Sequence, residues 1–181
     1  MDNGLIAKRY AKALYKLAKE HGKAGQLYEE MKTVARSFAD NPALQRTLSN
    51  PYIPAADKQK LMQEAAGSKC DDDFKSFIKL IIEHNREEYA QRMVLAYCDL
   101  YREENNISRV RIVTAKALPE NRMDRIREMV KTSFPNRTFE FSEEVDPTLI
   151  GGFQVYVDNV KMDASINNEL QQLRNNLISS E

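Results

Sequence analysis

The apolar residues of this chain change their spacing near Asn105-Asn106. Before that pair they recur about every 3.6 residues, which is the period of an amphipathic helix. After it they recur in several segments every second residue, which is the period of a strand with one buried face. The chain therefore cannot form one uniform bundle or one uniform sheet. We expect an all-helical domain over residues 1–105, followed by a strand-containing domain over residues 106–181.

Six helices are expected in the first domain from apolar spacing and from residues that begin or end helices. Gly22 and Gly67 suit helix C-termini, and Pro54 suits a helix N-terminus. The run Asp71 to Asp73 supplies acceptors and negative charge where a helix begins. The expected helices are Leu5–His21, Gly25–Ala39, a short one from Asn41-Pro42 to Leu48, Ala55–Ala66, Phe74–His84 and Arg86–Asn105.

The second domain has the expected element order β-α-β-β-β-α, so the fold class is α+β and mainly α. Asp158-Asn159 fits a two-residue hairpin turn, and Ser165 fits the N-cap of the last helix. That helix has an apolar face, which we expect to pack on the sheet; it carries Ile166, Leu170, Leu173 and Leu177. The other expected elements are strands Ile107–Thr114, Thr138–Val145, Gly152–Val157 and Val160–Asp163 and a helix over Pro119–Phe134.

The sequence lacks the residues that catalysis, metal binding or cofactor binding usually requires. Cys70 and Cys98 are far apart and have only His21 and His84 as possible companions, so no metal or redox site is expected. Gly151-Gly152 precedes a strand and not a helix, which excludes a phosphate-binding loop. The 27 Lys and Arg residues balance the 27 Asp and Glu residues, which argues against general nucleic-acid binding. No apolar run reaches the roughly 20 residues that span a bilayer, so membrane insertion is not expected.

Two other classes of function remain open from the residues alone. Glu143, Glu144 and Asp146 could form the carboxylate pair of a hydrolase, although a charged, solvated loop is the simpler interpretation. Arg109 and Arg111 could contact RNA from a strand face, as part of a cytosolic helical adaptor. That strand has no interleaved aromatic residues, which weakens the second hypothesis.

The first and fifth helices each carry more apolar surface than one core contact needs. On a helical wheel the apolar residues of each cover an arc of about 200°. Both helices could simply be central in the bundle, or their margins could line a groove for a helix from another protein. Periodicity does not choose between these hypotheses. The candidate groove residues are Ile6, Tyr10, Ala13, Leu14, Leu17, Phe77, Leu80 and Ile81.

Several segments in order resemble the delta subunit family of bacterial F-type ATP synthase, which is related to the mitochondrial oligomycin-sensitivity-conferring protein. The resemblance covers nearly the whole chain. The family usually has glycine where this chain has Ala164, so a less sharp turn is expected there. The matching segments are Arg9 to Tyr15, Asn50 to Pro54 with Lys58 and Leu61, Leu80 to Arg86, Val145 to Phe153, Asp163 to Ser165 and Leu170 to Leu173.

The resemblance implies a non-catalytic stator subunit without cofactor or metal. Its first and fifth helices are expected to hold the N-terminal helix of an alpha subunit of the catalytic head. Its C-terminal domain is expected to hold the b subunits of the peripheral stalk. The chain would then lie at the cytoplasmic face of the bacterial inner membrane as a peripheral protein, and no functional homo-oligomer is expected.

Overall fold

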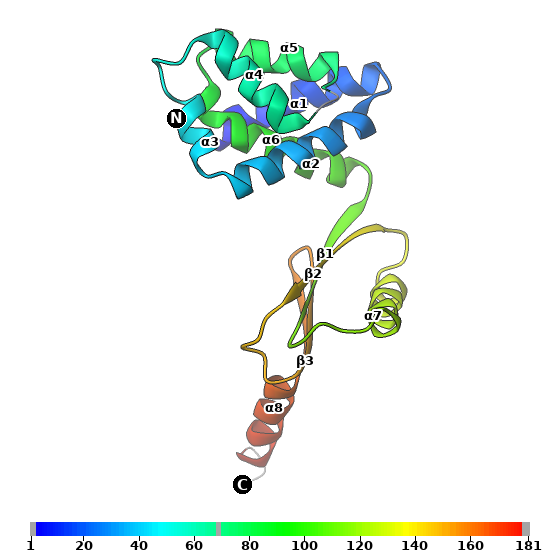
Figure 1. Cartoon of the computed structure of the whole chain (residues 1–181). Helices are drawn as coiled ribbons and strands as arrows, with labels where there is room; N and C mark the ends of the chain where they lie inside the picture. Colours follow the sequence, from blue (N-terminus) through cyan, green and yellow to red (C-terminus); the bar gives the residue numbers. More distant parts are fainter. Residues whose placement is uncertain (1–2, 68–69, 179–181) are drawn as a thin grey trace. The chain divides into compact units, whose positions relative to one another are not determined.

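A computed structural model describes residues 3–67 and 70–178 (Figure 1). The chain divides into two compact units, one ending at Glu104 and the other beginning at Asn105. The first is helical, and the second combines a four-stranded sheet with two helices over the described residues. The expected fold class, α+β and mainly α, is confirmed.

The helical unit follows the expected order of helices with one difference. Its last helix was expected from Arg86, but Asn85 has a φ of 52°, and a 3-10 turn over Glu87–Tyr89 precedes the helix. Asn85, with its positive φ, follows the end of the fifth helix, and the last helix begins only at Ala90, after the 3-10 turn. The helices are α1 (Asn3–Glu20), α2 (Ala24–Asp40), α3 (Ala43–Leu48), α4 (Ala55–Ala66), α5 (Asp72–Glu83) and α6 (Ala90–Glu104).

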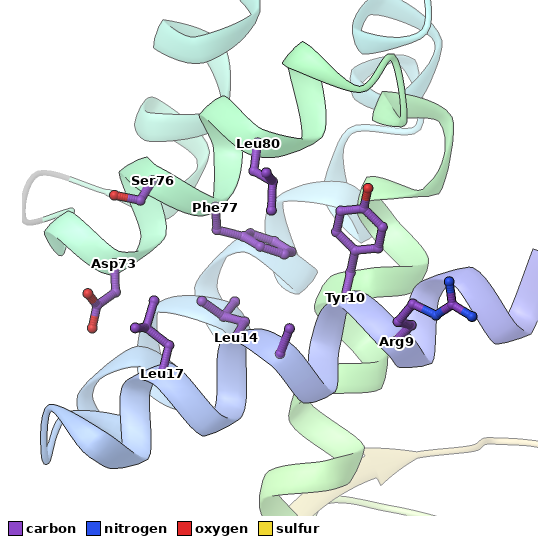
Figure 2. Close-up of a pocket in the computed structure, with 9 residues that line it drawn as sticks. Arg9, Tyr10, Leu14, Leu17, Asp73, Ser76, Phe77 and Leu80 are labelled. Carbon is purple, nitrogen blue, oxygen red and sulfur yellow. The ribbon is translucent and has the colours of Figure 1, made fainter.

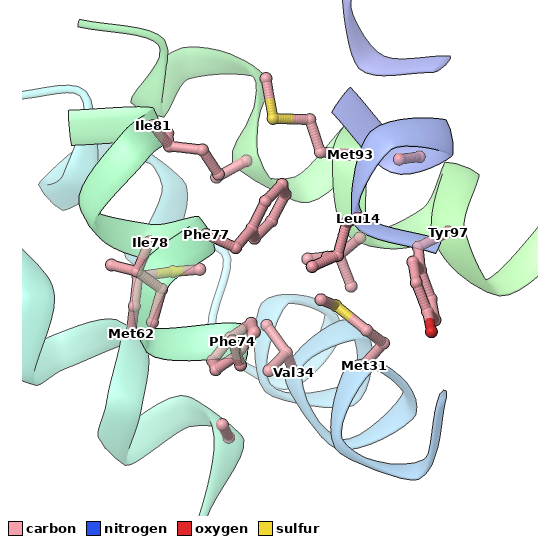
Figure 3. Close-up of a cluster of buried hydrophobic side chains, with 14 of the residues drawn as sticks. Leu14, Met31, Val34, Met62, Phe74, Phe77, Ile78, Ile81, Met93 and Tyr97 are labelled. Atoms are coloured by element: carbon pink, nitrogen blue, oxygen red, sulfur yellow. The ribbon is translucent and has the colours of Figure 1, made fainter. Parts of the chain in front are cut away.

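A single apolar cluster holds the helical unit together (Figure 3). Met31 of α2, Phe74 of α5 and both Met93 and Tyr97 of α6 are at most 1% exposed. Leu14 brings α1 into the same cluster. Burying one such side chain contributes roughly 1.5–3 kcal/mol, so contacts of this kind stabilise the unit more than surface ion pairs do.

A buried ion pair fixes the segment between α5 and α6. Lys58 Nζ of α4 lies 2.7 Å from Glu87 Oε1, and both side chains are buried. Gln45 Nε2 of α3 donates to the Glu87 carbonyl oxygen at 2.9 Å. Because a buried charge is costly without a partner, this pair sets where the 3-10 turn lies against α3 and α4.

The second unit is built on a mixed sheet with strand order β2-β1-β3-β4. Strands β1 (Ile107–Thr114) and β2 (Thr138–Val145) are parallel and are joined through α7 (Glu120–Ser133). Strand β3 (Gly152–Val157) is antiparallel to β1 and to β4 (Val160–Ser165). The first three strands have their expected bounds. β4 is longer than expected, because Ala164 pairs with Phe153 in the ladder; the expectation of a turn at Ala164 was wrong.

Helix α7 covers one face of this sheet. Val110, Ile112 and Val155 are fully buried in a cluster with Ile126 and Val130 of α7. These sheet residues share one face because side chains alternate along each strand and the register aligns them. The core of the C-terminal unit therefore lies between α7 and this face of the sheet.

The opposite face of the sheet is polar and internally paired. The Arg111 guanidinium lies 4.3 Å from the centre of the Tyr156 ring and donates to Glu144 Oε2 at 3.0 Å. Lys161 Nζ lies 5.7 Å from the same ring. A stacked and ion-paired arginine is held in place by its own neighbours.

The last helix, α8 (Ile166–Ile178), was expected to pack its apolar face on the sheet, and two residues of that face are described. Ser165 caps it, since Ser165 Oγ accepts from the Asn168 N–H at 3.3 Å. Ile166 and Leu170, however, are 45% and 56% exposed. The side chains of Leu173 and Leu177 lie outside the described residues.

Asp163 should make the C-terminal unit sensitive to acid. It accepts from Lys161 Nζ at 2.8 Å and from the Ser165 N–H at 3.0 Å, and these bonds lower the pKa of its carboxyl from 3.8 to about 2. Because the pKa is lower in the folded state, the stabilisation is complete above pH 4 and is lost as the pH falls towards 2. With solvent screening we expect a loss of about 1 kcal/mol.

This expectation is checked by urea unfolding at several pH values, followed through amide signals of β3 and β4. The Asp163→Asn variant should be less stable near neutral pH and should lose less stability below pH 4 than the original chain. Parallel pH profiles for the two chains would contradict the assignment.

Candidate partner-binding groove

Helices α1 and α5 border an open groove of about 560 Å³, here called the α1/α5 groove (Figure 2). Leu14 and Phe77 form its floor and are 4% and 5% exposed, because both also belong to the core. Leu17 and Leu80 stand at its sides and remain 37% and 41% exposed. The full lining is Arg9, Tyr10, Ala13, Leu14, Leu17, Asp73, Ser76, Phe77 and Leu80.

The two ends of the α1/α5 groove differ in charge. Arg9 lies towards the N-terminal end of α1, and Asp73 lies beside the C-terminal end of the same helix (Figure 2). His21 Nδ1 is 2.9 Å from both carboxylate oxygens of Asp73. This contact ties the end of α1 to the first turn of α5.

Asp71 strengthens the same connection from the N-cap of α5. Its carboxylate accepts from the Asp73 N–H at 2.9 Å and from Lys23 Nζ at 2.9 Å. These bonds, with the Asp73 N–H first, lower the pKa of Asp71 below its usual value. Because buried or partly buried polar contacts fix both helices here, the groove is formed before any partner arrives.

The structure brings six of the eight expected groove residues together at the α1/α5 groove, namely Tyr10, Ala13, Leu14, Leu17, Phe77 and Leu80. Ile81 is 2% exposed and packs in the core, where it lies near Met62 and Leu48. Ile6 is half-buried against the same core and does not line the groove. Both positions fall on the apolar arcs, but a wheel does not separate the margin that faces the core from the margin that faces outwards.

Sequence reasoning missed three residues that line the α1/α5 groove. Arg9, Asp73 and Ser76 are polar, so a search for surplus apolar surface passed over them. Their spacing was a usable signal, because Asp73 and Ser76 precede Phe77 and Leu80 by one helical turn on the same side of α5.

The acidic residues proposed for a hydrolase are engaged in structural contacts. Glu143 accepts from Arg127, and Glu144 pairs with Arg111. Asp146 accepts from the Thr148 N–H at 2.9 Å within its own turn. No group of three or more His, Cys, Asp or Glu side chains gathers for a metal ion anywhere in residues 3–67 and 70–178. These contacts favour a solvated, ion-paired surface over a hydrolytic site.

Cys70 lacks the environment of a reactive thiol. Burial is the main cause that raises the pKa of the Cys70 thiol to about 11, and the nearby Glu30 raises it further. A thiol with so high a pKa carries little thiolate at neutral pH. Across the described part of the chain, no helix has both the length and the apolar character that crossing a bilayer requires.

Comparison with known proteins places this chain in one family. The profile described as ATP synthase delta (OSCP) subunit matches residues 6–177, and the chain belongs to this family. The chain is 39% identical to the ATP synthase subunit delta of Phocaeicola vulgatus, over 97% of this chain and 95% of that protein. It is 37% identical to the protein of the same name from Parabacteroides distasonis, over 99% of each.

A solved structure shares the fold at low sequence identity. One chain in the cryo-EM structure of the Toxoplasma gondii mitochondrial ATP synthase hexamer matches with a TM-score of 0.69 and 19% identity, over 95% of this chain and 97% of that one. Family membership makes this protein a structural subunit of ATP synthase and not a catalytic one. The hypothesis of an RNA-binding adaptor has no support from these relatives.

Proposed function

We propose that this ATP synthase subunit ties the catalytic head to the peripheral stalk through two separate binding surfaces. The helical unit, up to about residue 105, holds the N-terminal helix of an alpha subunit in the α1/α5 groove. The unit from residue 106 onwards holds the C-terminal ends of the b subunits. In this arrangement the subunit lies at the cytoplasmic face of the bacterial inner membrane as a peripheral protein.

The observation that carries the proposal is the open apolar lining of the α1/α5 groove. Leu17 and Leu80 are more than a third exposed beside the buried faces of their helices. Ala13 lines the same groove, and its small side chain leaves room for a partner backbone. An amphipathic helix in such a groove buries its apolar side in the way that helix-in-groove complexes do. Interfaces of this kind typically bury roughly 800 Å² on each partner.

The stator role requires slow release under sideways load. Rotation of the central rotor would carry the head along unless the head is tied to the membrane-embedded stator. Exposed ion pairs contribute at most about 1 kcal/mol each, so they hold poorly under load. The His21–Asp73 contact helps to make the α1/α5 groove rigid. Apolar burial in a rigid groove avoids the entropy cost of ordering the site when the partner binds.

Exposed apolar residues support a stalk-binding surface on the C-terminal unit. Ile150 is 74% exposed in the loop before β3, and Ile166 and Leu170 are about half exposed one turn apart on α8. Ile166 lies against Gly151, since a Cβ on Gly151 would be 2.6 Å from Ile166 Cδ1. The loop and the helix therefore present neighbouring apolar side chains to a partner helix.

Affinity purification of the tagged full chain from native membranes tests this proposal. We expect the alpha and b subunits to co-purify after mild cross-linking, with cross-links from alpha to α1 or α5 and from b to residues after 105. Cross-links from both partners to the same unit, or recovery of neither partner, would contradict the proposed assignment of one partner to each unit.

A further inference from the structure

Three aspartates stand at the N-terminal end of α5, and each lies next to a basic side chain. Asp73 is the one of the three that lines the α1/α5 groove, near its Leu17 end (Figure 2). Its partner is a histidine, whereas the other two aspartates pair with lysines. The pairs are Asp71 with Lys23 at 2.9 Å, Asp72 with Lys75 at 2.8 Å and Asp73 with His21 at 2.9 Å.

The two lysine pairs keep their charges at every pH near neutrality. A hydrogen bond to Asp71 raises the pKa of Lys23, and a hydrogen bond to Asp72 raises the pKa of Lys75. A histidine, in contrast, is the side chain that changes its charge between about pH 5 and 8. The side chain of His21 is half exposed, so it can exchange a proton with solvent. Of the three pairs, the one at the groove is therefore the one whose net charge depends on pH.

The other ionisable groups packed around this pair keep one charge state over the same range. Glu30 of α2 accepts from the Asp71 N–H at 3.2 Å, and carboxylates as a class are ionised above about pH 6. Tyr97 of α6 lies within reach of the Asp73 charge, but burial raises the pKa of its hydroxyl, which stays neutral. The Cys70 thiol, with its pKa of about 11, also stays neutral.

Loss of a proton from His21 changes the charge of the pair but not its geometry. Nδ1 faces the carboxylate of Asp73, so it carries a hydrogen and donates it in both states of the ring. The proton that leaves is the one on Nε2, and the neutral ring keeps the same hydrogen bond. The tie between α1 and α5 therefore persists, while this end of the groove changes from neutral to negative.

The charge at this end matters because a bound helix has a positive end. A helix carries partial positive charge at its N-terminus and partial negative charge at its C-terminus. Arg9 lies at the opposite end of the α1/α5 groove, where the negative end of a bound helix fits (Figure 2). The positive end then lies beside Asp73.

We infer that His21 makes helix binding in the α1/α5 groove sensitive to pH. When the ring loses its proton, Asp73 is left as an uncompensated negative charge and attracts the N-terminus of the bound helix more strongly. Binding therefore tightens as the pH rises, and by linkage the binding of a helix releases part of a proton from His21. The inference rests on the proposed function, because it takes the alpha-subunit helix as the occupant.

Calorimetric titration of the full chain with a synthetic peptide of the alpha-subunit N-terminus, at pH 6 and at pH 8, tests the inference. The peptide is acetylated, because a free α-amino group would itself titrate in this range. The original chain should bind about three- to five-fold more tightly at pH 8. Near pH 7 the heat of binding should differ between buffers of different ionisation enthalpy, because a proton is released.

Two matched variants fix the charge at position 21. His21→Asn offers an uncharged N–H to Asp73 and should bind at the tighter level at both pH values. His21→Lys keeps a positive charge and should bind at the weaker level at both. The original chain should follow the lysine variant at pH 6 and the asparagine variant at pH 8. Titration of any other group would appear equally in all three chains.

The outcomes separate this inference from the proposed function. The same pH dependence in all three chains, or weaker binding by the original chain at pH 8 than at pH 6, would overturn the inference and leave the proposed function standing. No binding of the peptide to the original chain at either pH would contradict the proposed function itself. The released proton needs no variant to be measured, and its absence would also overturn the inference.

Discussion

Replacing Ala13 by glutamate is expected to weaken helix binding in the α1/α5 groove by about 100-fold, which corresponds to about 2.7 kcal/mol. Ala13 is exposed and lines the groove beside Leu14, so a bound helix would press the new carboxylate against an apolar surface. The fold should remain intact, because the side chain points away from the core. Methyl signals of Leu17 and Leu80 during titration with the alpha-subunit peptide measure this site separately.

Ala13→Ser is the matched control, since it adds a small polar group that can keep its own hydrogen bonds. It should bind within a few-fold of the original chain and unfold at the same temperature as Ala13→Glu. If the glutamate variant saturates along the same curve as the serine variant, Ala13 does not face a bound helix.

Replacing Gly152 by valine is expected to destabilise the C-terminal unit by at least about 3 kcal/mol. Gly152 has a φ of +81°, which β-branched residues rarely adopt. A Cβ there would also overlap the Ala164 carbonyl oxygen and lie 2.8 Å from Ser165 Cα, both of them backbone atoms of β4. Thermal unfolding followed through amide signals of β3 and β4 measures the loss.

Gly151→Ala is the control for that prediction, because its Cβ would meet only the flexible end of Ile166. It should cost much less stability than Gly152→Val. The valine variant should also bind the stalk b subunits more weakly while binding the alpha peptide as before. Loss of alpha-peptide binding, or nucleotide binding that Gly152→Val removes, would contradict the separate roles of the two units.

The strands were predictable because their signals are local. In β2, Phe139 and Phe141 alternate with polar residues and face α7, and Asp158-Asn159 fits the turn between β3 and β4. Each of these features is fixed by residues within a few positions, so no distant contact is needed to predict it.

The errors have the opposite origin, because they depend on contacts distant in sequence. The start of α6 is set by the 3-10 turn that Lys58 of α4 holds through Glu87. Ala164 continues β4 because it pairs with Phe153. Local sequence patterns show neither the Lys58–Glu87 contact nor the Phe153–Ala164 pairing. They therefore predicted a last helix that begins too early and a turn at Ala164.

The candidate groove was predictable in position but not in detail. The apolar arcs pointed to α1 and α5, and six of the expected residues line the groove between them. Packing against α4 and α6 decides which edge of each apolar arc faces the core. Periodicity alone therefore assigned Ile81 to the groove, although it packs in the core. The charged ends, Arg9 and Asp73, carry no apolar signal.

The central claim is that the α1/α5 groove transmits the holding force between head and stalk. The most direct measurement compares ATP hydrolysis with ATP-driven proton pumping in membranes whose only copy of this subunit is Ala13→Glu. We expect hydrolysis to continue while pumping falls to a small fraction of the level with Ala13→Ser, because the head is no longer held. Proton pumping at the control level, with hydrolysis also unchanged, would contradict the account.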